Sequence, residues 1–346
     1  MRAVAFEGIG RVAVREVADP RLEEPSDALV RVTASAICGS DLHFLSGKAP
    51  IEPGETLGHE AVGVVEAVGD EVARFSPGDR VVVAFDIVCG RCWFCWRGQT
   101  QLCEEFRNLG AGAFGGGLAG AQAERLRVPV ADVNLLAVPD GLDDERALFV
   151  GDVLTTGYYA ASIGEPGSGD SVAVVGCGPV GYACIVSLLA AGVGHVLALD
   201  RDPARLALAA SAGADPVDVR TCDPQMAVAD ATQDRGADVV IEAVGRPDAF
   251  ETAIGAVRRG GTVVVVGMYA GESTEIQLGV YWARALRIVF AGICPIHAWW
   301  ERSMSEVASG RIDPTAMVSH RLPLERAAEG YALFAAREAT KVVLRP

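Results

Sequence analysis

Four cysteines lie within one short stretch of the chain with the spacing C-x2-C-x2-C-x7-C: Cys89, Cys92, Cys95 and Cys103. Four thiolates on one loop can surround a tetrahedral Zn²⁺ completely, which leaves no open position for a substrate. Close spacing of this kind also occurs in iron–sulfur binding runs, and neighbouring cysteines can be redox-active. A fourth thiol is too many for a simple redox pair, so we interpret residues 89–103 as a lobe held by structural zinc.

A second group of candidate ligands precedes this lobe. Cys38 lies in AICGSDLH, and His59 and Glu60 are adjacent in LGHEAVG. Taken singly, a cysteine is most often a small buried residue, and a lone histidine is usually an ordinary hydrogen-bonding group. Together they offer sulfur, nitrogen and oxygen donors, and such a mixed set leaves room for a substrate oxygen on the metal.

A third motif predicts a dinucleotide site. Gly176, Gly178 and Gly181 form G-x-G-x-x-G directly after a predicted strand and at the start of a predicted helix, where backbone approaches a pyrophosphate closely. The next strand ends in Asp200, whose carboxylate would bind ribose hydroxyls and repel a 2′-phosphate. We therefore expect NAD rather than NADP, although Arg201 could accept a phosphate if its side chain turned inward.

The predicted secondary structure that must position these residues changes along the chain, from strands alone to strands that alternate with helices. Up to about residue 150 the runs LVRVTASAI, AVGVVEAVG and RVVVAF predict a β-rich domain. From about residue 170, strands alternate with helices such as PARLALAASAG and PDAFETAIGAVRRGG, which predicts an α/β doubly wound parallel sheet of six strands. The predicted strands are Val172–Val175, Val196–Leu199, Pro216–Val219, Val239–Glu242, Thr262–Val266 and Ile288–Gly292.

Composition narrows the partners. With 30 basic and 45 acidic side chains the formal charge is −15, which disfavours binding to nucleic acid and to anionic membranes. Aromatic residues interleave the four cysteines, as in a zinc knuckle that binds nucleic acid, but the acidic charge argues against that function. The uncharged stretch from Val172 to Leu199 contains glycines and a proline, so we interpret it as strand, turn and helix rather than a membrane span. No signal peptide is visible, and the nine cysteines fit a reducing, cytoplasmic location.

Taken together, these motifs resemble a known family. GHEAVGVVEAVGDEV, preceded by CGSDLH and followed by the four-cysteine lobe and G-x-G-x-x-G, is similar to the signature of zinc-dependent medium-chain alcohol dehydrogenases, and the match runs over essentially the full length. The lobe, the Gly-rich stretch before AQAERLRVP and GDVLTTGYY look closest to the formaldehyde-dehydrogenase-like branch. The resemblance implies a GroES-like catalytic domain (1–153), a Rossmann NAD-binding domain (154–293) and a return to the catalytic domain (294–346).

The resemblance also implies roles for individual residues. Cys38, His59 and Asp152 match catalytic zinc ligands, and Glu60 matches a carboxylate that can move on and off the metal. Ser40 and His43 match the family's proton relay, and Phe85 and Thr156 match positions near substrate and nicotinamide. Further expected cofactor contacts are Pro179, Val180, Arg205, Val266 and Lys341. Gly39 departs from the liver enzymes, which carry an arginine there, and this leaves Lys341 with more of the pyrophosphate charge to balance.

The expected reaction is hydride transfer between a small alcohol, or its carbonyl product, and NAD, in a homodimer or homotetramer with two zinc ions per chain. Two alternatives stay open: reduction of an activated C=C or C=N bond, and a non-catalytic nucleotide-sensing protein. Retention of Ser40 and His43 argues against the first, because such a reduction needs no alcohol proton relay. Substrate identity, the direction of the reaction and the role of Trp299 and Trp300 are left open by the sequence.

Overall fold

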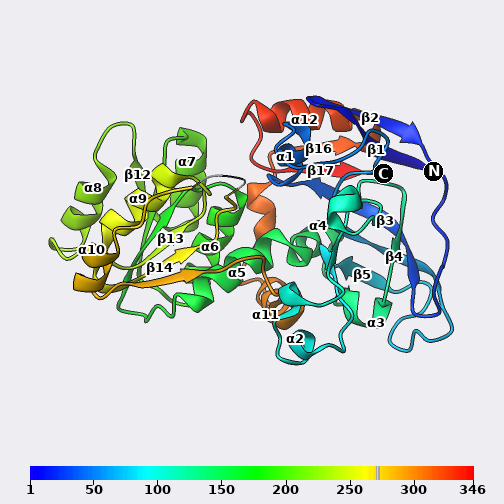
Figure 1. Ribbon diagram of the computed structural model, residues 1–346, viewed down its shortest axis with the longest axis horizontal. Coiled ribbons are helices and arrows are strands. Elements are labelled where there is room, and N and C mark those ends of the chain that lie inside the picture. The colour runs from blue at the N-terminus through cyan, green and yellow to red at the C-terminus, as the bar shows by residue number, and fades with distance from the viewer. Residues whose placement is uncertain (270, 272) are drawn as a thin grey trace. The chain divides into compact units, whose positions relative to one another are not determined.

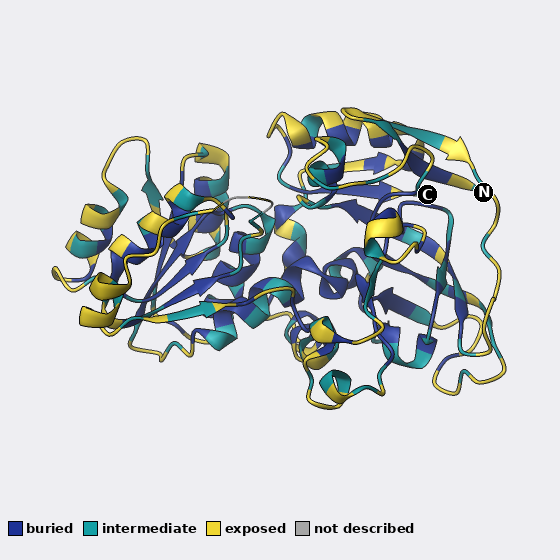
Figure 2. Ribbon diagram, viewed as in Figure 1, coloured by how far each residue is buried: buried dark blue, intermediate teal, exposed yellow. Residues whose placement is uncertain are grey.

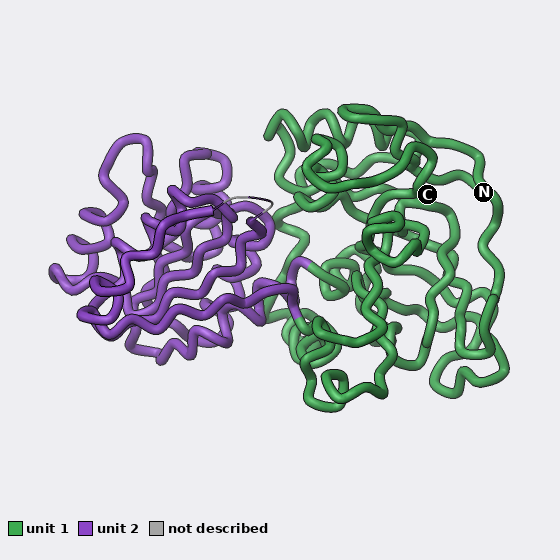
Figure 3. Tube along the Cα trace, viewed as in Figure 1, with its two compact units in different colours: residues 1–152, 295–346 green, residues 153–294 purple. Residues whose placement is uncertain are grey.

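The computed structural model describes residues 1–269, 271 and 273–346. The chain divides into two compact units: unit 1 comprises residues 1–152 and 295–346, and unit 2 comprises residues 153–294 (Figure 3). Each boundary lies one residue from the position expected from the sequence. Both chain termini therefore belong to unit 1, and unit 2 is an insertion between its two parts.

Unit 1 is built around a seven-stranded sheet in the order β16-β17-β3-β4-β5-β9, with β8 also paired to β3 (Figure 1). Along β3, side chains pointing into the core alternate with more exposed ones, as expected for a strand with one buried face. The strands are β3 (Ala28–Ile37), β4 (Glu60–Val68), β5 (Arg80–Val83), β8 (Arg125–Val128), β9 (Leu135–Ala137), β16 (His320–Pro323) and β17 (Val342–Arg345). A separate hairpin pairs β1 (Arg2–Gly8) with β2 (Arg11–Glu16), and β6 (Asp86–Ile87) pairs with β7 (Arg107–Asn108).

The last part of the chain completes this sheet. Strand β17 pairs antiparallel with β3, where Val342 faces Ile37, and parallel with β16. The strand-like KVVL thus returns to the β-rich unit. The helices of unit 1 are α1 (Asp41–Leu45), α2 (Trp93–Trp96), α3 (Ala131–Asn134), α4 (Asp144–Leu148), α11 (Ile296–Ala308) and α12 (Ala327–Ala335).

Unit 2 is a doubly wound sheet of six parallel strands in the order β12-β11-β10-β13-β14-β15, as the sequence predicted. Alternate residues of its central strands enter two buried clusters, one covered by α5, α6 and α7 and the other by α8 and α9 (Figure 2). The strands are β10 (Ser171–Val175), β11 (His195–Asp200), β12 (Asp215–Asp218), β13 (Ala237–Glu242), β14 (Val257–Val265) and β15 (Arg287–Phe290). The helices are α5 (Val153–Ile163), α6 (Pro179–Ala190), α7 (Pro203–Ala212), α8 (Pro224–Ala231), α9 (Pro247–Ala256) and α10 (Leu278–Ala283).

The largest error among the predicted boundaries lies at the end of α9. The run PDAFETAIGAVRRGG was expected to be helical to its closing glycines, but α9 ends at Ala256 and β14 begins at Val257. Val257 has an extended backbone and pairs with Ala237 of β13, so strand pairing overrides the helical pattern there. The uncharged stretch 172–199 forms β10, α6 and β11. Among the described residues, no helix combines the length and the apolar character needed to cross a membrane.

Candidate metal centres and cofactor site

The first cluster brings together four candidate ligands that are far apart in the sequence. Cys38 follows β3, His59 and Glu60 lie at the start of β4, and Asp152 follows a short 3₁₀ helix over Phe149–Gly151. Their donor atoms lie within 4.8 Å of one another. The residues expected to form one catalytic ligand set are therefore neighbours within unit 1.

A glycine shapes the backbone that leads into this cluster. Gly58 has a φ of +94°, in the left-handed region, and a Cβ atom there would lie 2.4 Å from Cγ of Gln122. Immediately afterwards β4 begins, and Glu60 pairs with Ala36 near the end of β3. This register places the His59–Glu60 pair beside the residue that follows β3, which is Cys38.

The two ring nitrogens of His59 face different partners. Nε2 lies 3.2 Å from Oδ2 of Asp152 and 3.3 Å from Oγ of Ser40, whereas Nδ1 lies 3.4 Å from Oδ1 of Asp41. Burial alone would lower the pKa of His59, but Asp41 and Asp152 raise it well above its ordinary value. Nε2 is thus the nitrogen that points at the other candidate ligands, and Nδ1 is oriented by a carboxylate.

Glu60 is paired with Lys341 deep in unit 1. Nζ of Lys341 donates to Oε1 of Glu60 at 2.5 Å, and both side chains are fully buried. Burial raises the pKa of Glu60 to about 7, against the opposing effect of the Lys341 charge. Oε2 of Glu60 has no hydrogen-bond partner among the described residues. Lys341, expected at a cofactor pyrophosphate, therefore contacts Glu60 in this structure, and a cofactor contact stays a prediction.

This donor set fits a zinc ion. It combines a soft thiol, an imidazole nitrogen and carboxylate oxygens, which are the ligand types that zinc accepts. The potential negative charge of Cys38, Glu60 and Asp152 exceeds what Lys341 can balance, and His59 is driven toward its protonated form. A cation among these donors would replace that proton and occupy the free oxygen of Glu60.

The expected relay and substrate residues surround His59. Ser40 precedes α1 and contacts the imidazole, while the ring of Phe85 lies edge-on to it at a centroid distance of 6.3 Å. His43 is on α1 and half-buried, and its pKa is lowered by burial and by the charge of Lys48. A neutral imidazole is therefore favoured at His43, which suits a group that accepts a proton.

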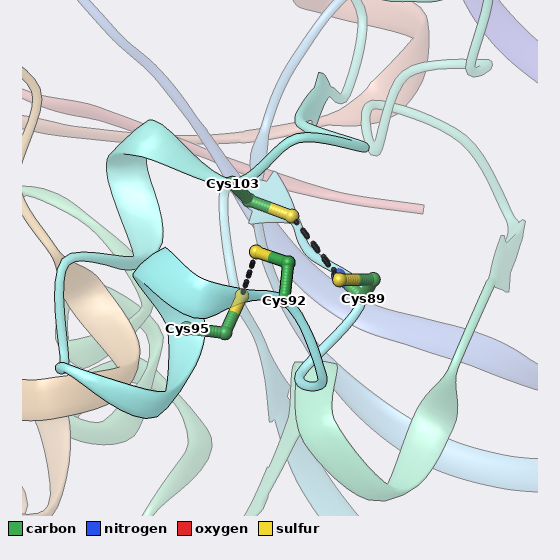
Figure 4. A group of neighbouring side chains, drawn as sticks. All are labelled: Cys89, Cys92, Cys95 and Cys103. Carbon is green, nitrogen blue, oxygen red and sulfur yellow. Dashed lines mark hydrogen bonds between the residues drawn. The ribbon is translucent and has the colours of Figure 1, made fainter.

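The second cluster is the four-cysteine lobe (Figure 4), in which the sulfur atoms point toward a common centre. Sγ of Cys92 lies 3.5 Å from Sγ of Cys95, and Sγ of Cys103 lies 3.5 Å from Sγ of Cys89. A tetrahedral zinc ion with Zn–S bonds of about 2.3 Å requires sulfur separations of about 3.8 Å. The lobe therefore fits a closed tetrahedral ion with little adjustment.

Backbone groups prepare the lobe for anionic sulfur. Amides of Cys89 and Glu105 each donate to Sγ of Cys103 at 3.3 Å. Hydrogen bonds from Glu104 and Cys95 lower the pKa of Cys92 to about 6. Burial raises the pKa of Cys95 and of Cys103, so Cys92 is the thiol of these three that most readily becomes the thiolate that binds metal.

Helix α11 packs beside the lobe and carries the two tryptophans whose role the sequence left open. Trp300 is buried with its ring edge-on to His297 at 5.1 Å, and Trp299 contacts the guanidinium of Arg302. Trp300 and His297 line a cavity of about 270 Å³ together with Cys95 of the lobe. Trp300 is thus part of the packing around the lobe.

The cofactor motif of unit 2 occupies the expected turn. Strand β10 leads into Gly176, which has a φ of +90°, and α6 starts at Pro179. A Cβ atom on Gly181 would lie 1.8 Å from the carbonyl oxygen of Gly176, so only glycine allows this close packing. Asp200, at the end of β11, accepts hydrogen bonds from the backbone of Cys177 at 2.7 Å and of Arg201 at 2.7 Å.

The position of this turn in the sheet is typical of nucleotide binding. β10 lies between β11 and β13, so the order of the strands reverses at its carboxyl end, where ligands of such sheets bind. Arg201 is exposed, and Arg205 lies half-buried with Nη1 3.5 Å from a Cβ atom built on Gly178. The remaining expected contacts of this unit, all half-buried, are Thr156, Val180 and Val266.

Sequence reasoning missed two residues beside the first cluster: Asp41, which faces His59, and Gln122, which contacts Asp41. Asp41 faces Nδ1 of His59, and it lies inside the CGSDLH motif, between the two relay candidates. Gln122 packs on Gly58 and donates to Oδ2 of Asp41 at 3.2 Å. An acidic residue three positions after a candidate ligand was a visible signal for Asp41, whereas nothing in the sequence distinguished Gln122.

Comparison with known proteins finds two family matches, one within unit 1 and one that covers most of unit 2 and the residues after it. The family "Alcohol dehydrogenase GroES-like domain" matches residues 24–140, and the family "Zinc-binding dehydrogenase" matches residues 179–309. The "Probable zinc-binding alcohol dehydrogenase" of Mycobacterium tuberculosis is 39% identical over 100% of this chain and 89% of its own length.

Two solved structures are similar over nearly their whole length. The alcohol dehydrogenase of Thermus sp. ATN1 superimposes with a TM-score of 0.97 and 47% identity, covering 100% of this chain and 99% of that one. A zinc-binding dehydrogenase of Sinorhizobium meliloti, described as putative and solved with NADP, gives a TM-score of 0.89 and 32% identity, covering 100% and 99%.

Proposed function

This chain belongs to the zinc-dependent medium-chain alcohol dehydrogenases and is an oxidoreductase, and on that premise we propose that it transfers hydride between an alcohol and NAD. The substrate would be a primary or secondary alcohol or a polyol, and the product an aldehyde or ketone. The observation that carries this proposal is the mixed donor set of Cys38, His59, Glu60 and Asp152, with Ser40 in contact with His59. The Mycobacterium tuberculosis and Thermus relatives are named as alcohol dehydrogenases, which does not favour the C=C or C=N reductase.

The protein's own residues have separable tasks in this reaction. A zinc ion held by Cys38, His59 and Asp152 would supply a Lewis acid that favours loss of the hydroxyl proton, and a nicotinamide cofactor held at the glycine-rich turn would supply the hydride acceptor. Ser40 takes the proton at Oγ, and His43 accepts it further along because its lowered pKa keeps a lone pair available. Phe85 packs against His59 and supplies an apolar surface beside the reacting group.

We further propose two zinc ions per chain, one in each cluster, and a preference for NAD over NADP. The closed sulfur lobe supports a structural ion, and the mixed set supports a catalytic one. The preference for NAD rests on Asp200, whose carboxylate lies against the glycine-rich turn and would repel a 2′-phosphate. Arg201 is exposed, and the Sinorhizobium meliloti relative was solved with NADP, so the rates with NAD and with NADP are the test of this preference.

A homodimer or homotetramer in the cytoplasm is proposed as the working form. Strand β15 is an edge of its sheet, and large apolar side chains on and near it are exposed: Leu278 by 75%, Trp282 by 84% and Phe290 by 66%. An apolar edge of this kind is normally covered by another chain. Nine free cysteines support a reducing compartment.

The test is a matrix of initial rates for alcohols and polyols, each with NAD and with NADP, on protein whose zinc content has been measured. We expect two zinc ions per chain, and a strong rate with NAD for one substrate class. Protein with two zinc ions that is silent across the matrix would overturn alcohol oxidation, and a higher kcat/KM with NADP would overturn the cofactor preference alone.

A further inference from the structure

A chain of buried polar side chains runs from the far side of His59 to helix α12. Oδ1 of Asp41 faces Nδ1 of His59 at 3.4 Å, and Oδ2 of Asp41 accepts from Nε2 of Gln122 at 3.2 Å. The Gln122 oxygen then accepts from the hydroxyl of Tyr331 at 2.9 Å. Asp41 and Gln122 are fully buried and Tyr331 is 1% exposed, so each hydrogen bond in the chain is shielded from water.

The direction of each hydrogen bond follows from the partners. Nε2 of Gln122 also donates to the carbonyl of Ala36 at 3.2 Å, and because a carbonyl can only accept, the amide nitrogen must face Ala36 and Asp41. The amide oxygen must therefore face Tyr331. Asp41 also accepts from the backbone of Cys38 at 2.9 Å, so Oδ2 receives only donors. Because Oδ2 is committed to these donors, Oδ1 of Asp41 is left facing Nδ1 of His59.

A carboxylate oxygen on this side of the ring favours the tautomer that metal binding requires. With its proton on Nδ1, the neutral imidazole presents a lone pair at Nε2, on the side of Asp152 and Ser40. Gln122 also fixes the backbone here, since its backbone N–H donates to the carbonyl of Leu57 at 3.0 Å and its side chain fills the space next to Gly58. Gln122 thus acts on His59 through both the carboxylate and the main chain.

We propose that Gln122 and Tyr331 are positioning residues of the catalytic metal site: they hold Asp41 so that His59 keeps its Nε2 lone pair on the metal. The inference rests on the proposed function, because it requires a metal in the first cluster. Tyr331 comes from the segment after unit 2, so the last helix of the chain controls a ligand that stands far earlier in the sequence.

Metal affinity, measured by chelator competition, tests this proposal with the four-cysteine lobe as a control inside the same molecule. Gln122→Met keeps the size of the side chain but removes its hydrogen bonds, and we expect zinc to bind about 10- to 100-fold more weakly at the first cluster only. Tyr331→Phe removes one hydroxyl and should weaken zinc by a few-fold. The double variant should bind zinc more weakly than Gln122→Met alone, because Tyr331 acts on Asp41 both through Gln122 and directly.

Cobalt replacing zinc in the first cluster gives a second readout, since its visible absorption depends on ligand geometry. Both variants should shift that spectrum, whereas Thr232→Val, which removes a buried hydroxyl bonded to Val228 in unit 2, should not. Unchanged zinc affinity and cobalt spectrum in Tyr331→Phe and Gln122→Met would overturn the positioning role. If Gln122→Met does not fold, Tyr331→Phe decides alone. Wild-type protein that binds metal only in the lobe would instead overturn the proposed function.

Discussion

The two candidate metal-binding clusters of unit 1 are assembled in opposite ways. The lobe takes its four sulfur donors from residues 89–103, whereas the mixed cluster takes its donors from positions as distant as Cys38 and Asp152. The lobe needs only a local loop, while the mixed cluster needs the pairing of β3 with β4. Local spacing is thus sufficient for a closed site, and a site with an open position depends on the whole fold.

The clusters also differ in what surrounds the donors. In the lobe the four sulfur atoms contact one another and backbone N–H groups, so a metal ion bound among them would be enclosed by protein ligands. In the mixed cluster, Oε1 of Glu60 accepts a hydrogen bond from Lys341, whereas Oε2 has no hydrogen-bond partner among the described residues. Because an unpaired buried oxygen is costly, this cluster is poised for a cation and for exchange of ligands.

The comparison predicts the largest effect when the single sulfur donor of the mixed cluster is removed. Cys38→Ser should lower kcat/KM by about 10³-fold or more, because the Lewis acid is lost or misplaced. Zinc content should fall from two to one per chain, and the thermal midpoint should change little. Substantial turnover in protein that has lost one zinc ion would show that the reaction does not depend on this cluster.

Ser40→Ala separates metal binding from proton transfer within the same cluster. We expect kcat to fall by about 10²-fold or more, since a positioned proton acceptor contributes on that scale. Two zinc ions should remain, because Ser40 contacts His59 without being needed as a ligand. Steady-state rates and metal analysis on the same sample provide the check, and unchanged turnover would remove Ser40 from the relay.

In the lobe the corresponding change should act on stability. Cys92→Ser should release one zinc ion and lower the thermal midpoint by several degrees or more, because structural zinc contributes directly to folding and each kcal/mol is worth about 2–4 °C in domains of this size. Turnover below the new midpoint should stay within about tenfold of wild type. A loss as large as that of Cys38→Ser would mean that the two clusters are not functionally distinct.

The smallest expected effect concerns the packing beside the lobe. Burial lowers the pKa of His297 to about 3 from an ordinary value of 6.5, so below pH 6.5 the unfolded chain binds a proton that the folded chain does not. Stability must therefore fall as the pH drops from 6.5 toward 3. At pH 5.5 we expect this linkage to amount to about 1 kcal/mol.

His297→Gln keeps a donor for Asn134 and removes the titration. Its thermal midpoint should depend less on pH than that of wild type between pH 7.5 and 5.5, measured at fixed zinc concentration. Parallel curves for the two proteins would show that His297 contributes no pH dependence and that the acid sensitivity belongs to the metal ligands.

The sequence predicted those parts of the molecule that depend on local patterns. The six strands of unit 2 and its glycine-rich turn follow from alternating hydrophobic runs and from spacing. The end of α9 was wrong because Val257 joins a strand through a partner, Ala237, that local pattern does not contain. The contacts of Lys341, Gln122 and Tyr331 were out of reach for the same reason, since each joins segments separated by most of the chain.

The insertion of unit 2 within unit 1 has a consequence for protein synthesis. Chain growth at about 5–20 residues per second separates Cys294, the last residue of unit 2, from Lys341, 47 residues later, by roughly 2–9 s. During that interval unit 2, which is continuous in the sequence, can fold, while Glu60 lacks its counter-charge and β3 lacks its neighbour β17. The nascent enzyme would therefore acquire a folded nucleotide-binding unit before a finished metal site, and the late arrival of β17 sets the earliest moment of activity.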